Sequence, residues 1–231
     1  MNPDGNAARF RKLLDAARVI IFDFDGVLAD SERHHFLSYR DVFRRYGHEV
    51  DETTYYKYWT SMGLGAKGEV ERHGLDLDPV AIHDEKQPIF SGYCRDGSIQ
   101  LFPEAKEMVE ILAGTDRVLT IASGSTRSDI EAILGNAGLE GRFRFIVGKD
   151  TVPTIKPAPD IFFAVLDELG VEPYECLVIE DAEKGVSAAV AAGIPVVVVR
   201  TKETRDFDFD LANLVVDSHQ QLLALVRDAA R

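Results

Sequence analysis

Short apolar runs alternate with longer amphipathic stretches over most of the chain. The runs are rich in β-branched residues and predict five buried strands, at 19–22, 118–122, 145–147, 177–179 and 196–199. Between them, residues 104–112, 128–137, 161–169 and 183–192 have helical periodicity, and Gly170 and Gly193 are placed to end two of these helices. This alternation predicts an α/β fold in which helices cover both faces of a parallel sheet.

Residues 31–95 interrupt that alternation. They contain no clear strand, and Phe36, Tyr39, Phe43 and Tyr46 form a helical stripe. We therefore expect a helical domain at 31–95, inserted into a core formed by 1–30 and 96–231. The stripe and the nearby aromatic residues are interpreted as the core of this domain, with a ligand platform as the alternative; the nearby residues are Tyr55, Tyr56, Tyr58 and Trp59.

The connections between the two expected domains, at 28–31 and 96–102, are candidate hinges. Movement there would let the helical domain close over the strand ends. Closure of that kind excludes bulk water from a reaction.

Composition narrows the classes of function. The 231 residues are 45% hydrophobic and 28% charged, which is typical of a soluble globular protein. A net charge of −13 without a basic block argues against nucleic-acid and membrane partners. Two cysteines, Cys94 and Cys176, are too few for a disulfide scaffold. The N-terminus lacks the apolar stretch of a secretory signal, so we expect a cytoplasmic protein.

The first predicted strand ends in two carboxylates, Asp23 and Asp25. Ligands of open α/β sheets bind beyond the carboxyl ends of the strands, so both side chains are candidates for chemistry. Carboxylates held together repel each other unless a cation lies between them or one is protonated. Mg²⁺ is the expected cation, because it binds carboxylates together with substrate phosphate. A solvated turn is the alternative for this pair alone.

Small and basic residues follow later strands. Ser123, Gly124 and Ser125 combine hydroxyls, close backbone approach and the N-terminus of a helix, which is suited to binding an anion. An ordinary N-cap serine is the alternative. Lys156 precedes Pro157, which biases it toward extended geometry and projects it from a stiff loop; a surface lysine is the alternative.

A further acidic pair, Glu180 and Asp181, follows the fourth predicted strand. Gly185 lies shortly beyond it and would let a helix pack closely. Acidic residues at a helix N-terminus are common, so the pair alone is weak evidence. Together with the other groups it places a second set of carboxylates at the same edge of the sheet.

The order of these four groups resembles the haloacid dehalogenase-like superfamily. The amino acids within each motif are similar as well. The resemblance covers residues 19 to about 199, and the four motifs are 23–31, 121–125, 156–160 and 180–182. The resemblance implies a Rossmann-like parallel sheet with an inserted α-helical cap domain. It also implies a Mg²⁺-dependent phosphatase acting on a small-molecule phosphate ester.

The resemblance assigns a role to each motif residue. Asp23 would be the nucleophile that forms an aspartyl-phosphate, and Asp25 the general acid and then base. Ser123, Gly124, Ser125 and Lys156 would hold phosphoryl oxygens, with His35 also contacting substrate. Mg²⁺ would be bound by Asp23, the backbone carbonyl of Asp25, Asp181 and, directly or through water, Glu180.

The chain is similar to both phosphoglycolate-type phosphatases and β-phosphoglucomutase, and the mutase remains the alternative function. His35 occupies the position of a functionally important mutase histidine. However, the cap segment 61–66, including Met62 and Ala66, lacks the basic residues that a mutase needs for its second phosphate, and Thr126 replaces a lysine. Lys67, Arg72 or Arg127 could substitute. A phosphatase is therefore preferred, and its substrate stays open.

Three further interpretations are weaker. A signalling receiver domain would be about half this length, with its acceptor aspartate after a middle strand. A catalytically silent binding module would not need every motif residue. The glycines at 63, 65 and 68 fit a dinucleotide-binding pattern but follow no apolar strand, so we expect a loop between cap helices there. A monomer or weak dimer is expected.

Overall fold

The computed structural model describes residues 3–60 and 64–230. The chain divides into two compact units, one made of Met1–Asp30 with Gln100–Arg231 and the other of Ser31–Ile99. The second unit extends four residues past the expected boundary at Arg95. Helix α5 (Pro79–Asp96) continues to Asp96, and Ile99 is buried, so these residues belong with the helices.

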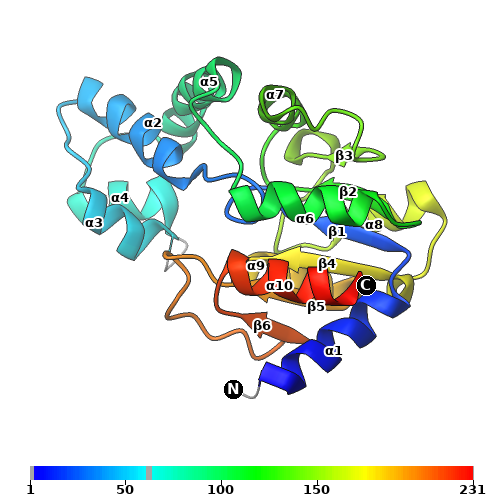
Figure 1. Cartoon of the computed structure of the whole chain (residues 1–231). Helices are drawn as coiled ribbons and strands as arrows, with labels where there is room; N and C mark the ends of the chain where they lie inside the picture. The colour runs from blue at the N-terminus through cyan, green and yellow to red at the C-terminus, as the bar shows by residue number, and fades with distance from the viewer. Residues whose placement is uncertain (1–2, 61–63, 231) are drawn as a thin grey trace. The chain divides into compact units, whose positions relative to one another are not determined.

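The first unit is built on a six-stranded parallel sheet in the order β3-β2-β1-β4-β5-β6 (Figure 1). The predicted α/β fold with a Rossmann-like parallel sheet is therefore confirmed. Its strands are β1 (Val19–Phe22), β2 (Val118–Ala122), β3 (Ile146–Val147), β4 (Cys176–Glu180), β5 (Val196–Val199) and β6 (Leu214–Val216). All four residues of β1 and of β5 are buried, as expected for strands covered on both faces.

Helices cover both faces of this sheet (Figure 1). Helices α1 (Pro3–Ala16), α6 (Pro103–Ala113) and α10 (His219–Ala229) pack together on one face. Helices α8 (Asp160–Leu169) and α9 (Glu183–Ala191) pack on the other, over a core that includes Ile161, Phe162 and Val186. Helix α7 (Arg127–Ala137) and the 3₁₀ turns η2 (Lys149–Thr151) and η3 (Pro173–Glu175) complete the unit.

Two α-helices and one strand of this unit were not expected from the sequence. The N-terminal segment forms α1, whose Phe10 and Leu14 are buried four residues apart on one face. Strand β6 is only three residues long. Helix α10 begins at an N-cap, Ser218, and buries Leu222 and Val226 on the same helical face. The apolar spacing in α1 and α10 is the signal that could have identified them.

The second unit is helical. It contains α2 (Glu32–Arg45), α3 (Glu52–Thr54), the π-helix η1 (Tyr55–Thr60), α4 (Gly65–His73) and α5, with no strand among its described residues. Phe36, Phe43, Tyr55 and Trp59 are buried in one cluster, which confirms that these aromatic side chains form core. Tyr46 differs, because it is 47% exposed and donates a hydrogen bond to Glu85 at the surface.

The glycine pattern at 63–68 is only partly described. Gly63 lies outside the described residues, whereas Gly65 and Gly68 belong to α4. The expected loop is therefore wrong for residues 65–68, which are helical. Residues 31–60 and 64–99 contain no strand from which a dinucleotide-binding turn could leave, consistent with the sequence argument.

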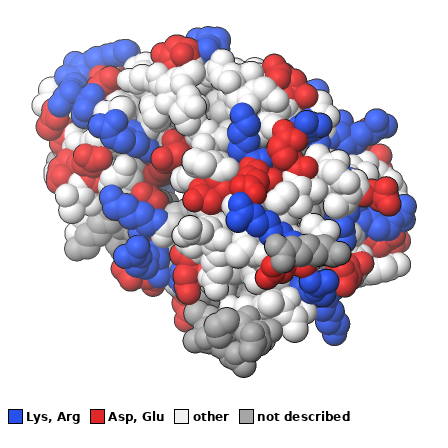
Figure 2. Space-filling view, in the orientation of Figure 1, with Lys and Arg blue, Asp and Glu red and all other residues white. Residues whose placement is uncertain are grey.

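Charged side chains of both signs are interspersed over the face shown in Figure 2. In residues 3–60 and 64–230 no helix combines the length and apolar character that crossing a bilayer requires.

Candidate functional site

The strand order places two acidic strand ends side by side. Strand β1 lies between β2 and β4, and Phe22 is in register with both Ile121 and Ile179. The next residues, Asp23 and Glu180, therefore leave adjacent strands at the same edge. This is also where the strand order reverses, which is the position at which open α/β sheets bind ligands.

Lys156 connects these strand ends. Its Nζ donates hydrogen bonds to Asp23 Oδ1 at 2.6 Å, to Glu180 Oε1 at 2.7 Å and to the carbonyl oxygen of Ala122 at 2.9 Å. The side chain is only 4% exposed, so the alternative of a surface lysine is wrong. An ammonium group has three protons, and here all three have an acceptor. Lys156 is thus held rigidly between two buried carboxylates.

The buried charges shift each other's protonation. The pKa of Asp23 is raised to about 7: burial raises it most, Lys156 lowers it, and the nearby charges of Glu180 and Asp25 add to the increase. Burial by itself would lower the pKa of Lys156, but Asp23 and Glu180 outweigh it and raise that pKa above its usual value. The lysine therefore stays charged, and Asp23 is the group that gains or loses a proton near neutral pH.

Backbone groups fix the second carboxylate. Glu180 is 1% exposed, and its Oε2 accepts hydrogen bonds from the backbone N–H groups of Asp181 and Ala182. A Cβ on Gly185 would lie 1.6 Å from Glu180 Oε1, so glycine is needed where α9 packs against this carboxylate. Both oxygens of Glu180 are thereby occupied, one by the lysine and one by the chain.

A second glycine makes room for Asp181. Gly26 has a φ of +79°, and a Cβ there would lie 2.1 Å from Asp181 Oδ2. The backbone of the turn that follows Asp25 therefore packs directly against the carboxylate of Asp181, and there is no room for a side chain at position 26.

Three carboxylates converge tightly enough to hold a metal ion. One oxygen each of Asp23, Glu180 and Asp181 lies within 4.8 Å of the others. All-oxygen, anionic donors suit a hard cation such as Mg²⁺. The carboxylate of Asp25 is not part of this group, and the resemblance implied its backbone carbonyl as the metal ligand.

The side chain of Asp25 instead meets the serine motif. Ser125 Oγ donates to Asp25 Oδ2 at 2.6 Å, and Ser123 Oγ accepts from the N–H of Ser125 at 3.0 Å. Helix α7 begins after Thr126, whose hydroxyl accepts from the N–H of Asp129. The N-cap is therefore threonine, and the alternative of an ordinary N-cap serine for this motif is wrong. Gly124 is exposed between the two buried serines.

The chain is similar to known proteins over the stretch that holds most of these residues. The family model of haloacid dehalogenase-like hydrolases matches residues 20–199. The chain belongs to this family. The predicted membership is thus confirmed, and with it the prediction that the protein is a hydrolase.

Relatives of this hydrolase span most of its length. Fructose-1-phosphate phosphatase YqaB of Escherichia coli is 34% identical over 182 residues, which cover 78% of this chain and 95% of that protein. A structure of a CbbY mutant from Rhodobacter sphaeroides in complex with xylulose-(1,5)bisphosphate has a TM-score of 0.76 at 28% identity, covering 91% and 99% of the two chains. The β-phosphoglucomutase of Clostridium difficile, at 23% identity and a TM-score of 0.72, covers 93% and 97% and shows the fold alone.

His35, the remaining predicted site residue, lies in the helical unit of the hydrolase. Its ring stacks on Phe90 with centroids 3.9 Å apart, and its Nδ1 lies 2.6 Å from Nζ of Lys86. Lys86 is only 3% exposed and was missed by the sequence argument. Its signal was its spacing, because Ile82, Lys86 and Phe90 repeat every four residues along the buried face of α5.

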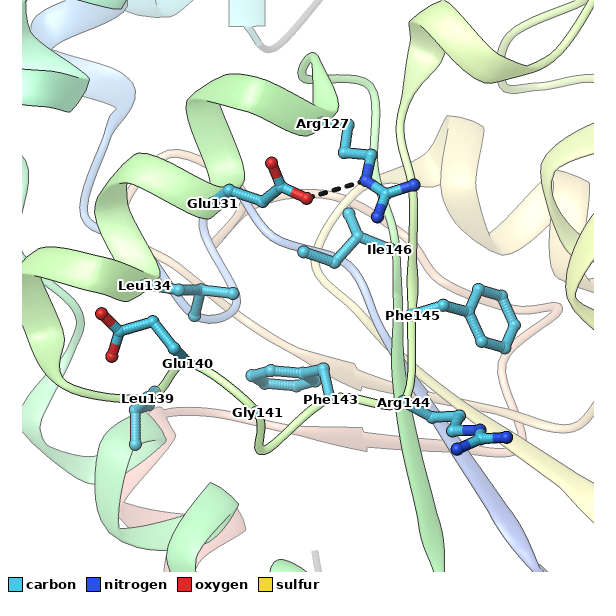
Figure 3. Close-up of a pocket in the computed structure, with 10 residues that line it drawn as sticks. All are labelled: Arg127, Glu131, Leu134, Leu139, Glu140, Gly141, Phe143, Arg144, Phe145 and Ile146. Carbon is cyan, nitrogen blue, oxygen red and sulfur yellow. Dashed lines mark hydrogen bonds and ion pairs between the residues drawn. The ribbon is translucent and has the colours of Figure 1, made fainter.

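A pocket at the β3 edge of the hydrolase is separate from these groups (Figure 3). Its volume is about 240 Å³, and Leu134 and Phe143 line it while Arg127 pairs with Glu131 at 2.8 Å. Neither Asp23 nor Lys156 lines it, so it is not the candidate active site.

Proposed function

We propose that this hydrolase is a Mg²⁺-dependent phosphatase of a small phosphorylated metabolite, such as a sugar phosphate or phosphoglycolate-like ester. The proposal depends above all on Asp23, whose carboxylate is buried where the strand order of the sheet reverses. Lys156 donates a hydrogen bond to one of its oxygens. A carboxylate placed beside a fixed cation can attack an anionic phosphate, because the cation offsets the repulsion between them.

Asp23 is proposed to attack phosphorus in line with the ester oxygen. The bond from phosphorus to that oxygen breaks as the aspartyl-phosphate forms, and protonated Asp25 donates its proton to the departing alkoxide. Asp25, now a carboxylate, then takes a proton from water as the water oxygen attacks phosphorus. Phosphate leaves, Asp23 is regenerated, and Asp25 is again protonated.

The hydrogen bond from Ser125 to Asp25 supports this assignment of the proton. It fixes the orientation of the Asp25 carboxyl at the strand end.

The other motif residues are proposed to bind the phosphoryl group and the ion. Ser123 would hold a phosphoryl oxygen, and Lys156 would hold another in exchange for one of its three present acceptors, with Gly124 and Ser125 offering close backbone approach. Asp23, Asp181 and the carbonyl of Asp25 would hold Mg²⁺, with Glu180 acting through water since both its oxygens are occupied. The ion, when bound, supplies positive charge against the phosphoryl oxygens.

The relatives support a phosphorylated carbohydrate as substrate. One is named a fructose-1-phosphate phosphatase, and another was crystallised with a sugar bisphosphate. We propose that the helical unit acts as a cap that selects among such esters, with His35 and the buried Lys86 as its first candidates for contacting substrate.

The mutase alternative is weakened by the contacts of the basic residues that could have replaced its missing anchors. Arg127 pairs with Glu131, Lys67 lies 3.7 Å from Glu71, and Arg72 donates to Glu69. A cation already paired with a carboxylate is a poorer partner for a second phosphate. We therefore favour hydrolysis over phosphoryl return to the sugar.

The test is phosphate release from a panel of sugar, glycerol and glycolate phosphates, with Mg²⁺ or with EDTA. We expect release that EDTA abolishes and that Asp23→Asn eliminates, while Asp116→Asn, an exposed aspartate of the same unit, behaves as wild type. Activity that survives full metal removal would overturn the mechanism.

The same preparation separates hydrolysis from isomerisation. With β-glucose 1-phosphate and a catalytic amount of the 1,6-bisphosphate, we expect little glucose 6-phosphate. Formation of glucose 6-phosphate faster than phosphate release from any panel member would favour the mutase.

A further inference from the structure

A second group of metal-ligating side chains lies in the helical unit. His48, in the loop between α2 and α3, and Glu69 and His73, one turn apart on α4, bring one donor atom each to within 4.8 Å of the others. Glu69 Oε1 lies 2.8 Å from His48 Nε2 and 3.4 Å from His73 Nε2. Two imidazole nitrogens therefore face a single carboxylate oxygen.

Hydrogen bonds to its other oxygen orient the carboxylate of Glu69. Its second oxygen, Oε2, accepts hydrogen bonds from Trp59 Nε1 at 3.1 Å and from Arg72 Nη2. Because Oε2 is occupied in this way, Oε1 is the oxygen presented to the histidines. Outer contacts of this kind fix the ligand geometry of metal sites.

Two packing contacts restrict the ligands further. The ring of His48 packs edge-on against Phe43, with centroids 5.5 Å apart. Glu69 is 1% exposed, so its carboxylate cannot turn out to water. The cluster therefore starts with two of its three ligands held in place.

The distances between the ligand atoms fit a metal ion with tetrahedral coordination. Nitrogen and oxygen ligands at about 2.0–2.1 Å from Zn²⁺ lie about 3.3 Å from each other in a tetrahedron. The contact of Glu69 with His73 already has that length, and the contact with His48 needs to open by about half an ångström. His73 is 44% exposed, which leaves a side open for a water molecule as fourth ligand.

We propose that His48, Glu69 and His73 form a binding site for a borderline transition-metal dication, with Zn²⁺ the first candidate. Two imidazoles and one carboxylate select Zn²⁺ over Mg²⁺, which prefers oxygen ligands alone. The site is independent of the proposed phosphatase chemistry. Its ion would connect the loop after α2 to α4 and so stabilise the helical unit.

Arg72 is the group that binding has to rearrange. Its Nε donates to His73 Nε2 at 3.3 Å, and its guanidinium lies 4.3 Å from the centre of the Tyr58 ring. On metal binding His73 would give up the contact with Arg72, which keeps its bond to Glu69 Oε2 and its place over the tyrosine. The ion therefore replaces this weak hydrogen bond and the 2.8 Å hydrogen bond between His48 Nε2 and Glu69 Oε1, whose proton it displaces.

The experiment uses the chain's single tryptophan as its reporter. Trp59 donates to the proposed ligand Glu69, so Zn²⁺ binding should change its fluorescence saturably. The full-length protein is titrated with Zn²⁺ in excess Mg²⁺, and bound Zn²⁺ is measured by equilibrium dialysis. His73→Ala and His48→Ala are compared with His83→Ala, an exposed histidine of the same unit outside the cluster.

We expect wild type and His83→Ala to bind one Zn²⁺ more per chain than either cluster variant. Loss of a ligand should weaken the fluorescence titration about a hundredfold or more, since loss of outer-sphere partners alone costs 10- to 100-fold. Circular dichroism checks that each variant keeps its helices. If all four proteins bind Zn²⁺ equally, or none shows the fluorescence change, the cluster is only a hydrogen-bonding network for buried Glu69.

Discussion

The protonation of Asp23 should control how the stability of the metal-free protein depends on pH. Burial raises its pKa in the folded chain to about 7, against an ordinary value of 3.8. Between these values the folded state keeps the proton and the unfolded state loses it. The free energy of unfolding therefore falls as pH rises through this window, by at most about 1.4 kcal/mol per pH unit.

The size of the effect follows from the shift. A difference of about three pKa units corresponds to a loss of about 4 kcal/mol between pH 4 and pH 8. Asp23→Asn cannot ionise, and its amide oxygen can still accept the hydrogen bond from Lys156. In EDTA the variant should thus be more stable than wild type by about 4 kcal/mol at pH 8, and by little at pH 4.

The assay is urea unfolding at intervals from about pH 4 to 8, with the difference between the two proteins as the measured quantity. Trp59 lies in the other unit, so circular dichroism and amide hydrogen exchange of β1 and β4 report on the core. His219, whose pKa burial lowers, contributes to both proteins alike and cancels in the difference. Parallel stability curves for wild type and Asp23→Asn would refute the reasoning.

Three further outcomes are expected from the same cluster. Mg²⁺ should raise the thermal unfolding midpoint more at pH 8 than at pH 5.5, because protons compete for Asp23 below a pKa of about 7; equal shifts would contradict this. Gly185→Ala should cost about 1–3 kcal/mol in urea unfolding and reduce phosphate release, because its Cβ would lie 1.6 Å from Glu180 Oε1. Gly135→Ala in α7, where the nearest contact is 3.4 Å, is the control and should change stability by no more than about 1 kcal/mol. Lys156→Met should destabilise the protein by about 3–5 kcal/mol at pH 8, opposite in sign to Asp23→Asn, since it leaves two buried carboxylates without their cation; an unchanged urea midpoint would argue against a charged pair.

Local patterns in the sequence were sufficient for the central part of the fold. Buried parallel strands need continuous apolar runs, and helices need a repeat near 3.6, so both can be identified within a few residues. Strand β6 and helix α10 were missed for different reasons. The strand is a run of only three residues, Leu214–Val216, at the edge of the sheet, whereas α10 has an apolar spacing that predicts a helix.

The residues of the candidate site could be predicted from the sequence for a related reason. Catalytic groups of an α/β sheet follow strand ends, so Asp23, Ser123 and Glu180 could be identified from the runs that precede them. The glycine at 185 was also noted from sequence as an allowance for close packing. That it packs against the carboxylate of Glu180 could not be known, because a helix and a strand end meet there only in the folded chain.

The sequence by itself determined which residue types stand at strand ends and in what order, because that information is contained in neighbouring positions along the chain. Only the tertiary structure decided which of them touch. Lys156 binds Asp23 across 133 positions because β1 lies between β2 and β4, an order that no local pattern specifies. His48 and Glu69 meet for the same reason, since the packing of α4 against the loop after α2 sets their distance and their spacing in sequence does not.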